Sequence, residues 1–211
     1  MSKKMAKKNS TGKFIVIEGI DGCGKGTQVR NIVEHLRDKG VQTEELAYPD
    51  REGPIGSLID SYLHRKHDFS KEVQFLLYFT DFLKDKNKKN EWLENGKTII
   101  SDRYFTSTLA YQCLGGIPVK HGLKVAEYFK LPIPDLIVFL DIDPQVSWDR
   151  KMSAKKGKVD RHEADLEFQK NLANIYRSFA KKNILSRWAV VNGELSQKEV
   201  FEEIKKHIES A

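Results

Sequence analysis

The sequence predicts an α/β fold with a five-stranded parallel sheet and helices on both faces of that sheet. Short apolar runs alternate with segments of helical periodicity, which is the pattern of strands joined by crossover helices. The runs are rich in Ile and Val and show little alternation, as expected for strands buried on both faces. With 211 residues, 39% of them hydrophobic and 31% charged, the chain is long enough for one such domain.

Five runs are predicted as strands: Phe14–Glu18, residues 41–48, Thr98–Asp102, Leu136–Asp141 and Trp188–Asn192. The second run is weaker and more polar than the others. Parallel α/β sheets bind their ligands in the crevice beyond the carboxyl ends of the strands. The residues that follow these runs are therefore the first candidates for a functional site.

Helices are predicted between the strands. Helical periodicity covers residues 29–36, 55–63 and 200–208, and is expected to run unbroken from about residue 70 towards residue 93. Gly40 and Gly96 are predicted helix stops. Asp143-Pro144 supplies a cap and a first-turn proline for a further helix, and Ser196 with Glu199 forms a capping box before the last one.

The positive charge of the chain is concentrated at its N-terminus. The net charge is +6, and residues 1–12 carry four lysines without any acid or aromatic residue, so that +2 remains for the rest of the chain. We predict that residues 1–12 form a basic disordered extension and that residues 13–211 form a single domain. Because no stacking aromatics accompany these lysines, no nucleic-acid partner is expected.

Membrane-spanning and secreted classes are disfavoured. No apolar run approaches the roughly 18–20 residues that span a bilayer, and no charged-then-apolar leader opens the sequence. The two cysteines, Cys23 and Cys113, form no CxxC pair. We therefore expect a cytoplasmic protein without a membrane partner.

A glycine-rich loop between the first strand and the first helix is the strongest motif. Residues 18–28 read Glu-Gly-Ile-Asp-Gly-Cys-Gly-Lys-Gly-Thr-Gln, a G-x-x-x-x-G-K phosphate-binding loop (P-loop) in its required strand–loop–helix context. Glycines let successive backbone N–H groups turn inward as an anion-binding nest, and Lys25 can reach the β- and γ-phosphates of a nucleotide. This motif predicts a P-loop NTPase fold. The predicted nucleotide-binding residues are Gly19, Asp21, Gly22, Cys23, Gly24, Lys25, Gly26 and Thr27.

One position of the loop departs from the general motif. Gly26 stands where a Ser or Thr usually contacts Mg²⁺, and Thr27 is the next hydroxyl. Asp102, at the end of the third predicted strand, is the natural carboxylate of a neighbouring strand. We expect Mg²⁺ to be held mainly by nucleotide phosphates, by water and by Asp102 through water, with Thr27 as a further candidate.

From about residue 14 to residue 208 the chain resembles the thymidylate kinase family. The P-loop carries an acid, Asp21, at the position that in this family binds the 3′-hydroxyl of the acceptor deoxyribose. Residues 48–51, Tyr-Pro-Asp-Arg, resemble the family's segment after the second strand. That resemblance implies that Arg51 binds the acceptor phosphate, a bidentate task that suits a guanidinium group.

Residues 102–104, Asp-Arg-Tyr, resemble a signature of the same family. The resemblance implies that Arg103 neutralises charge between the donor and acceptor phosphates, so Arg103 joins Lys25 and Asp21 as a catalytic candidate. The acceptor-binding residues that it implies on the following helix are Ser107, Tyr111 and Gln112. Tyr111 would lie against the sugar and disfavour a 2′-hydroxyl, although a tyrosine in an apolar helix is as often a core residue.

Residues 75–82 resemble the base-binding helix of the family. The aromatic residue that stacks on thymine maps to Tyr78, whereas Phe82 stands where the family usually has an arginine that hydrogen-bonds the base. A phenylalanine cannot donate that bond. Base choice must then depend on another donor or on Gln112.

The segment from about residue 150 to residue 163 resembles the lid of the family and is rich in lysine and arginine. A run of charge is usually a solvated surface, but phosphoryl transfer needs positive charge near the equatorial oxygens, which a mobile lid often supplies. Some members of the family carry a catalytic arginine in the P-loop where this chain has Gly22. The resemblance therefore implies a catalytic lid cation, with Arg161 and Arg150 as the leading candidates.

Together, the resemblance implies direct in-line transfer of the ATP γ-phosphoryl group to dTMP, Mg²⁺ as a cofactor and a homodimeric assembly. One alternative is the same chemistry on another nucleoside monophosphate or on a deoxynucleoside. The Gly-Lys-Gly-Thr-Gln run is shared with adenylate kinases, whereas the Asp-Arg-Tyr segment is not. A second alternative is a nucleotide-dependent switch, although the Asn-Lys-x-Asp box of guanine-specific switches is absent from the sequence.

Overall fold

The computed structural model describes residues 12–155 and 165–210. Most of the predicted basic extension and the second part of the predicted lid, including Arg161, lie outside the described residues. None of the described helices is long and apolar enough to cross a membrane.

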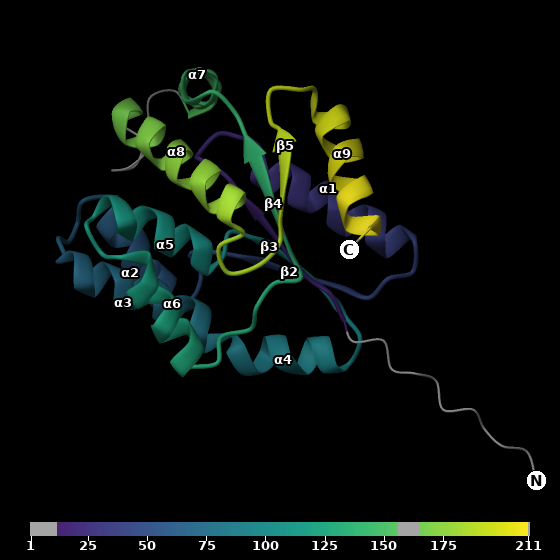
Figure 1. The fold of residues 1–211 in the computed structure, drawn as a ribbon, viewed down its shortest axis with the longest axis horizontal. Coiled ribbons are helices and arrows are strands. Elements are labelled where there is room, and N and C mark those ends of the chain that lie inside the picture. The colour runs from purple at the N-terminus through teal and green to yellow at the C-terminus, as the bar shows by residue number, and fades with distance from the viewer. Residues whose placement is uncertain (1–11, 156–164, 211) are drawn as a thin grey trace, which may run out of the picture.

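A five-stranded parallel sheet forms the centre of the molecule, as predicted (Figure 1). The strands are β1 (Phe14–Glu18), β2 (Thr43–Ala47), β3 (Thr98–Asp102), β4 (Leu136–Asp141) and β5 (Trp188–Asn192). Their order across the sheet is β2-β3-β1-β4-β5. Four strands have the predicted bounds, and β2 is shorter than predicted at both ends. Every residue of β1 is buried, as the apolar run without alternation indicates.

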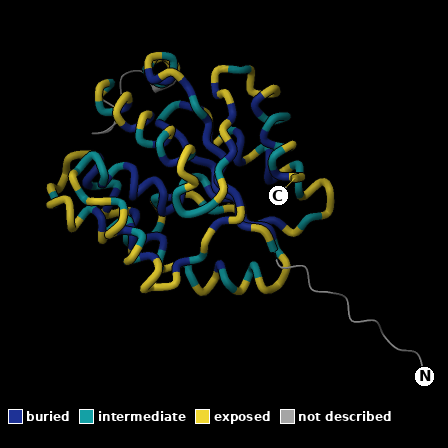
Figure 2. The backbone as a smooth tube through the Cα atoms, in the orientation of Figure 1, coloured by how far each residue is buried: buried dark blue, intermediate teal, exposed yellow. Residues whose placement is uncertain are grey.

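Helices cover both faces of this sheet. They are α1 (Lys25–Asp38), α2 (Pro54–Leu63), α3 (Lys71–Lys84), α4 (Lys86–Glu94), α5 (Phe105–Leu114), α6 (Val119–Tyr128), α7 (Pro144–Lys155), α8 (Leu166–Lys182) and α9 (Gln197–Glu209). Helices α1 and α9 pack together on one face, and α5 and α8 pack together on the other (Figure 1). Burial follows this layering. The strands are mostly buried (dark blue in Figure 2), and the outer faces of the helices are exposed (yellow).

The predicted caps of α7 and α9 start helices in the structure, and so does Ser70, which was predicted only as an approximate helix start. The Ser70 side chain accepts a hydrogen bond from the Val73 amide at the start of α3, and Ser196 and Glu199 form a reciprocal capping box at the start of α9. The Asp143 carboxylate accepts a 2.7 Å bond from an amide in the first turn of α7. These helix starts are therefore specified by local sequence.

The prediction of one long helix over residues 70–93 is wrong. The chain leaves the helix at Asp85, where φ is −94° and ψ is 6°, and α3 and α4 are separate helices. The Asp85 carboxylate accepts hydrogen bonds from Tyr48 at 2.9 Å and from Lys84 at 2.6 Å. The break between α3 and α4 thus coincides with a contact to Tyr48, in the segment after β2. Helical periodicity in the sequence does not reveal this break.

Helices α6 and α8 were not predicted. Helix α8 does carry a signal, because Leu172, Tyr176 and Phe179 recur at helical spacing and are all buried. Asp165 caps this helix by accepting a 2.9 Å bond from the Phe168 amide. Helix α8 contributes a residue to the site described below.

The strand register brings the P-loop and the end of β3 together. Ile17 of β1 pairs with Asp102 of β3, and the Arg103 amide donates a 3.0 Å bond to the Ile17 carbonyl. Because the strands are parallel, the loops after β1 and β3 leave the sheet at the same edge. The functional residues therefore gather at this edge.

Candidate active site

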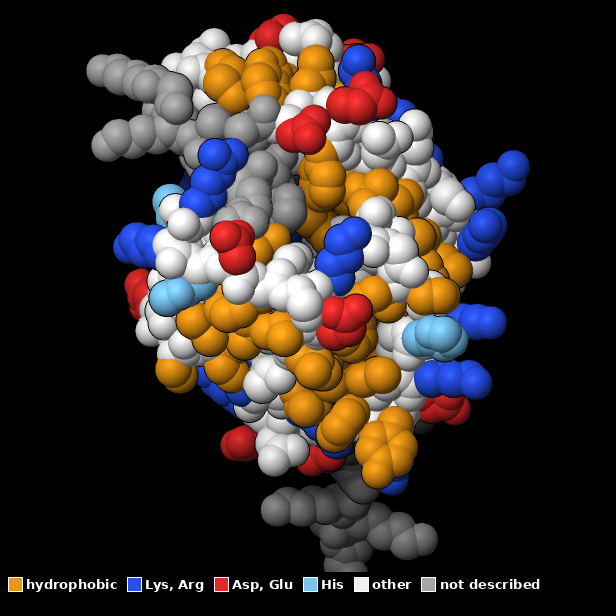
Figure 3. All heavy atoms as spheres, turned by 90° about the vertical axis from the view of Figure 1, so that its left-hand side faces the viewer, with side chains coloured by type: hydrophobic (Ala, Val, Ile, Leu, Met, Phe, Trp, Pro, Cys, Tyr) orange, Lys and Arg blue, Asp and Glu red, His pale blue; other side chains and the backbone are white. Residues whose placement is uncertain are grey.

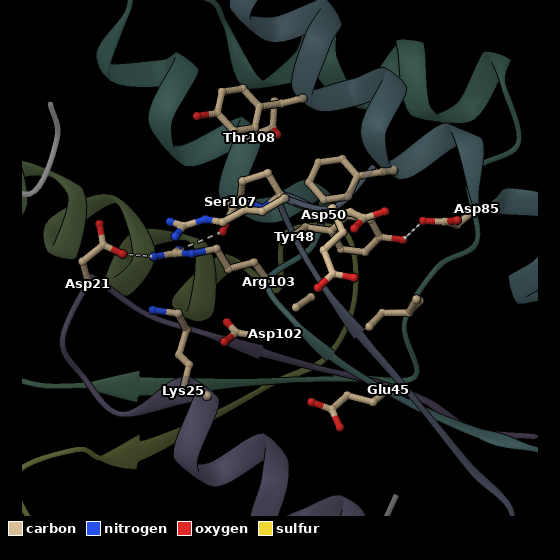
Figure 4. A pocket seen from close by; sticks show the side chains of 18 of the residues that line it. Asp21, Lys25, Glu45, Tyr48, Asp50, Asp85, Asp102, Arg103, Ser107 and Thr108 are labelled. Carbon is tan, nitrogen blue, oxygen red and sulfur yellow. Dashed lines mark hydrogen bonds and ion pairs between the residues drawn. The ribbon is translucent and has the colours of Figure 1, made fainter. Parts of the chain in front are cut away.

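A cavity of about 830 Å³ lies beyond the carboxyl ends of β1, β2 and β3 (Figure 4). Most of the predicted site residues line it: Asp21, Gly22, Gly24, Lys25, Gly26, Thr27, Arg51, Tyr78, Asp102, Arg103, Ser107 and Tyr111. Gly19, Cys23, Gln112 and Arg150 are not among the lining residues. The strand order thus places residues from the P-loop, β3, α3 and α5 around one space.

The P-loop is shaped to surround an anion. Gly22 and Gly24 have φ values of 86° and 100°, in the left-handed region that favours glycine. Lys25 is buried, and its Nζ donates to the carbonyl oxygens of Gly19 at 3.1 Å and Ile20 at 2.9 Å. A phosphate that entered the loop would offer Lys25 charged acceptors in place of these neutral carbonyls.

Arg103 and Asp21 form a partly buried ion pair in the cavity. The Nη2 atom of Arg103 lies 2.5 Å from Oδ1 of Asp21, and Nη1 donates to the Gly19 carbonyl at 3.1 Å (Figure 4). Burial alone would raise the pKa of Asp21, but the positive charges of Arg103, Lys151 and Lys25 hold that pKa far below its ordinary value. Asp21 is therefore an anion among three cations and remains ionised at neutral pH.

The backbone of Arg103 is held in an uncommon conformation. Its φ of 66° lies in the left-handed region, which non-glycine residues rarely adopt. Such conformations cost free energy and persist where the surroundings enforce them, often at functional sites. Here the turn after β3 directs the guanidinium group towards the P-loop.

Tyr111 belongs to this cluster. Its hydroxyl donates to Oδ2 of Asp21 at 3.2 Å, and the Arg103 guanidinium lies over its ring at 5.7 Å from the centroid. Tyr111 therefore lines the cavity beside Asp21 and Arg103. Ser107, one turn earlier on α5, accepts a 3.1 Å bond from Nη1 of Arg103.

The residues around Asp102 fit a hydrated divalent cation. Oδ1 of Asp102 is buried and has no hydrogen-bond partner among the described residues, which leaves an anionic oxygen to be satisfied by a ligand. A Cβ atom at Gly26 would lie 3.5 Å from Oδ2 of Asp102. Gly26 therefore leaves space beside the carboxylate, and an oxygen ligand of this kind suits Mg²⁺.

The other half of the cavity is lined by Arg51, Tyr78 and Phe82. The Nε of Arg51 lies 3.5 Å from Oδ1 of Asp60, and the Arg51 side chain is 56% exposed, so this arginine lies at the open side of the cavity. Phe82 is buried against the Tyr48 ring at 4.6 Å. This half also carries charged side chains, among them Asp50, Glu52 and Asp85.

The similarity of this chain to known proteins covers nearly its whole length. The sequence model of the family described as Thymidylate kinase matches residues 17–204. The thymidylate kinase of Dictyostelium discoideum is 32% identical over 202 residues, which are 94% of this chain and 86% of that protein. The thymidylate kinase of Carboxydothermus hydrogenoformans is 34% identical over 202 residues, which are 94% and 97% of the two chains. The chain belongs to the thymidylate kinase family.

A solved structure agrees with this membership. The thymidylate kinase of Candida albicans superposes with a TM-score of 0.75 and 26% sequence identity, covering 95% of this chain and 92% of that one. The predicted P-loop NTPase fold is thereby confirmed. As a member of the thymidylate kinase family, the protein is a phosphotransferase with ATP as its co-substrate.

Of the two predicted lid cations, Arg150 lies outside the lining of the cavity. Arg150 is on α7 and donates to the carbonyl oxygens of Gly193 at 2.9 Å and Glu194 at 3.4 Å, beyond the end of β5. Its neighbour Lys151 is one of the charges that lower the pKa of Asp21. Consecutive helical residues point about 100° apart, so a run of cations cannot by itself show which member faces the P-loop. Arg161 lies outside the described residues.

Sequence reasoning also missed three residues of the site. Glu18 and Tyr176 are fully buried beside Arg103. Thr108 lines the cavity, and its buried Oγ1 has no hydrogen-bond partner among the described residues. A carboxylate in an apolar strand was a signal for Glu18, because buried acids need partners. Tyr176 carried no such signal, since its neighbours come from distant parts of the chain.

Proposed function

We propose that this member of the thymidylate kinase family transfers the γ-phosphoryl group of ATP to dTMP, giving dTDP and ADP. The observation that carries the proposal is the place of Arg103, whose guanidinium lies between the P-loop and the half of the cavity that Tyr78 and Arg51 line. A cation there can neutralise charge on a phosphoryl group that passes from one nucleotide to the other.

The donor half of the site is the P-loop. Residues 19–27 would bind the ATP phosphates through backbone amides, and Lys25 would exchange its carbonyl acceptors for phosphate oxygens. Mg²⁺ would be held by the nucleotide phosphates, by water and by Asp102, with Thr27 nearby in the cavity lining. When bound, Mg²⁺ neutralises phosphate charge and orients the phosphates.

The acceptor half would bind dTMP. Arg51 would bind its phosphate, and Asp21 would accept a hydrogen bond from its 3′-hydroxyl beside Tyr111. Tyr78 would stack on the base. The hydroxyl of Thr108 would bond the base edge in place of the arginine that Phe82 replaces. Ser107 and the buried Gln112 support this side of the cavity from α5.

The chemistry needs no general base. An anionic oxygen of the acceptor phosphate attacks the γ-phosphorus of ATP, one P–O bond forms, and the bond to the β–γ bridging oxygen breaks as ADP leaves. Lys25 and Arg103 stabilise the charge that spreads over the transferring group. A lid cation, Arg161 or Arg150, would complete this neutralisation, and Lys151 joins them because of its charge beside Asp21.

Assembly and location belong to the same proposal. Large apolar side chains are exposed on α2 and α3, namely Leu58, Val73 and Leu76. Hydrophobic side chains gather over the molecular face that these helices help to form (Figure 3). We propose that this face joins two copies of the chain in a homodimer.

The unpaired cysteines Cys23 and Cys113 are consistent with a cytoplasmic location.

A steady-state kinase assay with ATP, Mg²⁺ and a panel of acceptors tests the activity. We expect dTMP to have the highest kcat/KM among the nucleoside monophosphates and deoxynucleosides. The related enzyme of Candida albicans is described as having a broad substrate specificity, so the panel includes the other pyrimidine and purine monophosphates. Faster turnover of AMP than of dTMP would overturn the choice of acceptor, and hydrolysis of ATP without any acceptor dependence would overturn the kinase assignment.

A further inference from the structure

A buried hydrogen-bond network lies behind Arg103, on the side away from the cavity. Its centre is the hydroxyl of Tyr176, a fully buried residue of α8. This hydroxyl donates to Oε2 of Glu18 at 3.0 Å, accepts from Nη1 of Arg103 at 3.3 Å and lies 2.9 Å from Oγ of Ser107. One tyrosine therefore contacts residues of β1, of the turn after β3 and of α5.

We propose that Tyr176 is a positioning residue, which holds the guanidinium group of Arg103 in the place where it can serve phosphoryl transfer. Tyr176 is not among the residues that line the cavity, so it would act through Arg103 and not on a nucleotide. This inference rests on the proposed function, in which Arg103 is the catalytic cation.

Two carboxylates compete for Arg103. Asp21, on the cavity side, is 2.5 Å from Nη2, whereas Glu18, on the buried side, is 4.0 Å from Nη1. Glu18 is fully buried, where an ion pair is strongest. Without other partners, Glu18 would attract the guanidinium away from the cavity.

Neutral donors satisfy Glu18 instead. Its carboxylate accepts bonds from the Tyr104 amide at 3.2 Å and the Thr106 hydroxyl at 2.6 Å. It also accepts bonds from the hydroxyls of Ser107 at 2.7 Å and Tyr176 at 3.0 Å. Four hydrogen bonds can stabilise a buried carboxylate without a close cation. The 4.0 Å separation of Arg103 from Glu18 is a consequence of this arrangement.

The Tyr176 hydroxyl has two effects on Arg103. It supplies one of the four donors to Glu18, and it accepts directly from Nη1 of Arg103. Its loss would leave Glu18 with a free lone pair and would remove one of the three acceptors around Nη1 of Arg103, so that the two charges would approach each other. A displacement of about 1 Å in a catalytic group can lower the rate by about 10²-fold.

Tyr176→Phe tests the proposal, with Tyr104→Phe as its matched control. Both tyrosines are fully buried, but the hydroxyl of Tyr104 donates to the Pro132 carbonyl at 2.9 Å, whereas that of Tyr176 contacts Arg103 and Glu18. We expect Tyr176→Phe to lower kcat about 10- to 100-fold, with the KM for ATP changed less than about threefold and a melting temperature similar to that of the control. Tyr104→Phe should keep kcat within about twofold of the wild type.

A second readout does not depend on the identity of the acceptor. In nitrogen-15 NMR of arginine side chains, we expect slowly exchanging, separate guanidinium protons for Arg103 in the wild type and in Tyr104→Phe, and faster exchange in Tyr176→Phe. Failure of the proposed function would appear in the wild type, as a lack of activity on dTMP. In that case the variants are compared on the acceptor that the wild type does use.

Two results would overturn the proposal. One is an unchanged kcat in folded Tyr176→Phe, and the other is an equal loss of kcat in Tyr176→Phe and Tyr104→Phe, which indicates general destabilisation. If Tyr176→Phe does not fold, Ser107→Ala provides a second route to the same displacement, because Ser107 also bridges Nη1 of Arg103 and Oε2 of Glu18. An unchanged arginine spectrum in Ser107→Ala would then contradict the proposal.

Discussion

Arg103 combines features that are seldom found together in one residue. Its backbone is left-handed, its side chain is 12% exposed, and it lies between the carboxylates of Asp21 and Glu18. Burial alone would lower the pKa of Arg103, but the acidic groups around it, among them Asp21 and Glu18, hold that pKa well above its ordinary value. A permanent cation at this place needs no proton transfer to act on phosphate.

The residue-scale prediction concerns this cation. Arg103→Ala should lower kcat by about 10³-fold, while the affinity for ATP should change by less than about tenfold, because the P-loop binds the donor. The melting temperature should also fall, because the partly buried carboxylate of Asp21 loses the cation with which it is paired. Steady-state kinetics and calorimetric titration of ATP measure these effects.

Arg37→Ala is the control for this variant. Arg37 donates to the Thr43 carbonyl at 3.0 Å, at the other end of the sheet from the cavity. Its removal should lower stability slightly and leave kcat unchanged. Near-normal turnover of Arg103→Ala would exclude Arg103 as the transition-state cation.

At the scale of elements, the break between α3 and α4 places a charged residue in the interior. Lys89 of α4 is fully buried and donates to the Tyr48 hydroxyl at 3.0 Å and to the Phe82 carbonyl at 2.9 Å. Tyr48 in turn donates to Asp85 at 2.9 Å. This chain of bonds joins α3 and α4 to the segment that carries Arg51.

Burial lowers the pKa of Lys89 from 10.5 to about 7, although the negative charge of Asp85 opposes this shift. Between about pH 7 and pH 10 the unfolded chain therefore keeps a proton that the folded protein has released. The free energy of unfolding should rise with pH in this window, by up to about 1.4 kcal/mol per pH unit. Below pH 7 the folded and the unfolded chain both hold the Lys89 proton. The full cost of burying the charged lysine then lowers the free energy of unfolding.

Lys89→Met should remove this rise. The measurement is urea-induced unfolding of the variant and the wild type across the window, with Lys88→Met as the control, because Lys88 is exposed on the same helix. The control should keep the pH dependence of the wild type. A wild type and a Lys89→Met variant with parallel stability curves would show that Lys89 does not titrate in this range.

The whole-molecule prediction concerns assembly. The protein should be a dimer in size-exclusion chromatography with light scattering, and Leu76→Glu should raise the dissociation constant of that dimer by at least about tenfold. Leu76 is 55% exposed on α3, so a glutamate there should not disturb the monomer. Val190→Glu, on the exposed side of β5, is the control with a similar exposure of 53%. A wild type that stays monomeric at all concentrations would contradict the proposed interface.

The amino-acid sequence by itself determined the strands, the capped helix starts and the P-loop. Four strands keep their predicted bounds, and Ser70 and Ser196 start α3 and α9 as predicted. These features depend on apolar runs, glycines and caps within a few residues, whose preferences are local. The family resemblance added the residues expected around two nucleotides.

Only the tertiary structure decided how distant residues meet. The order of the strands places β3 beside β1, and so brings Arg103 to Asp21, while α8 brings Tyr176 to Glu18 from 158 residues away. The helix break at Asp85 likewise accompanies a contact with Tyr48. Local periodicity carries no information on such contacts, because their free energy arises from burial and charge pairing between elements that only the folded chain places together.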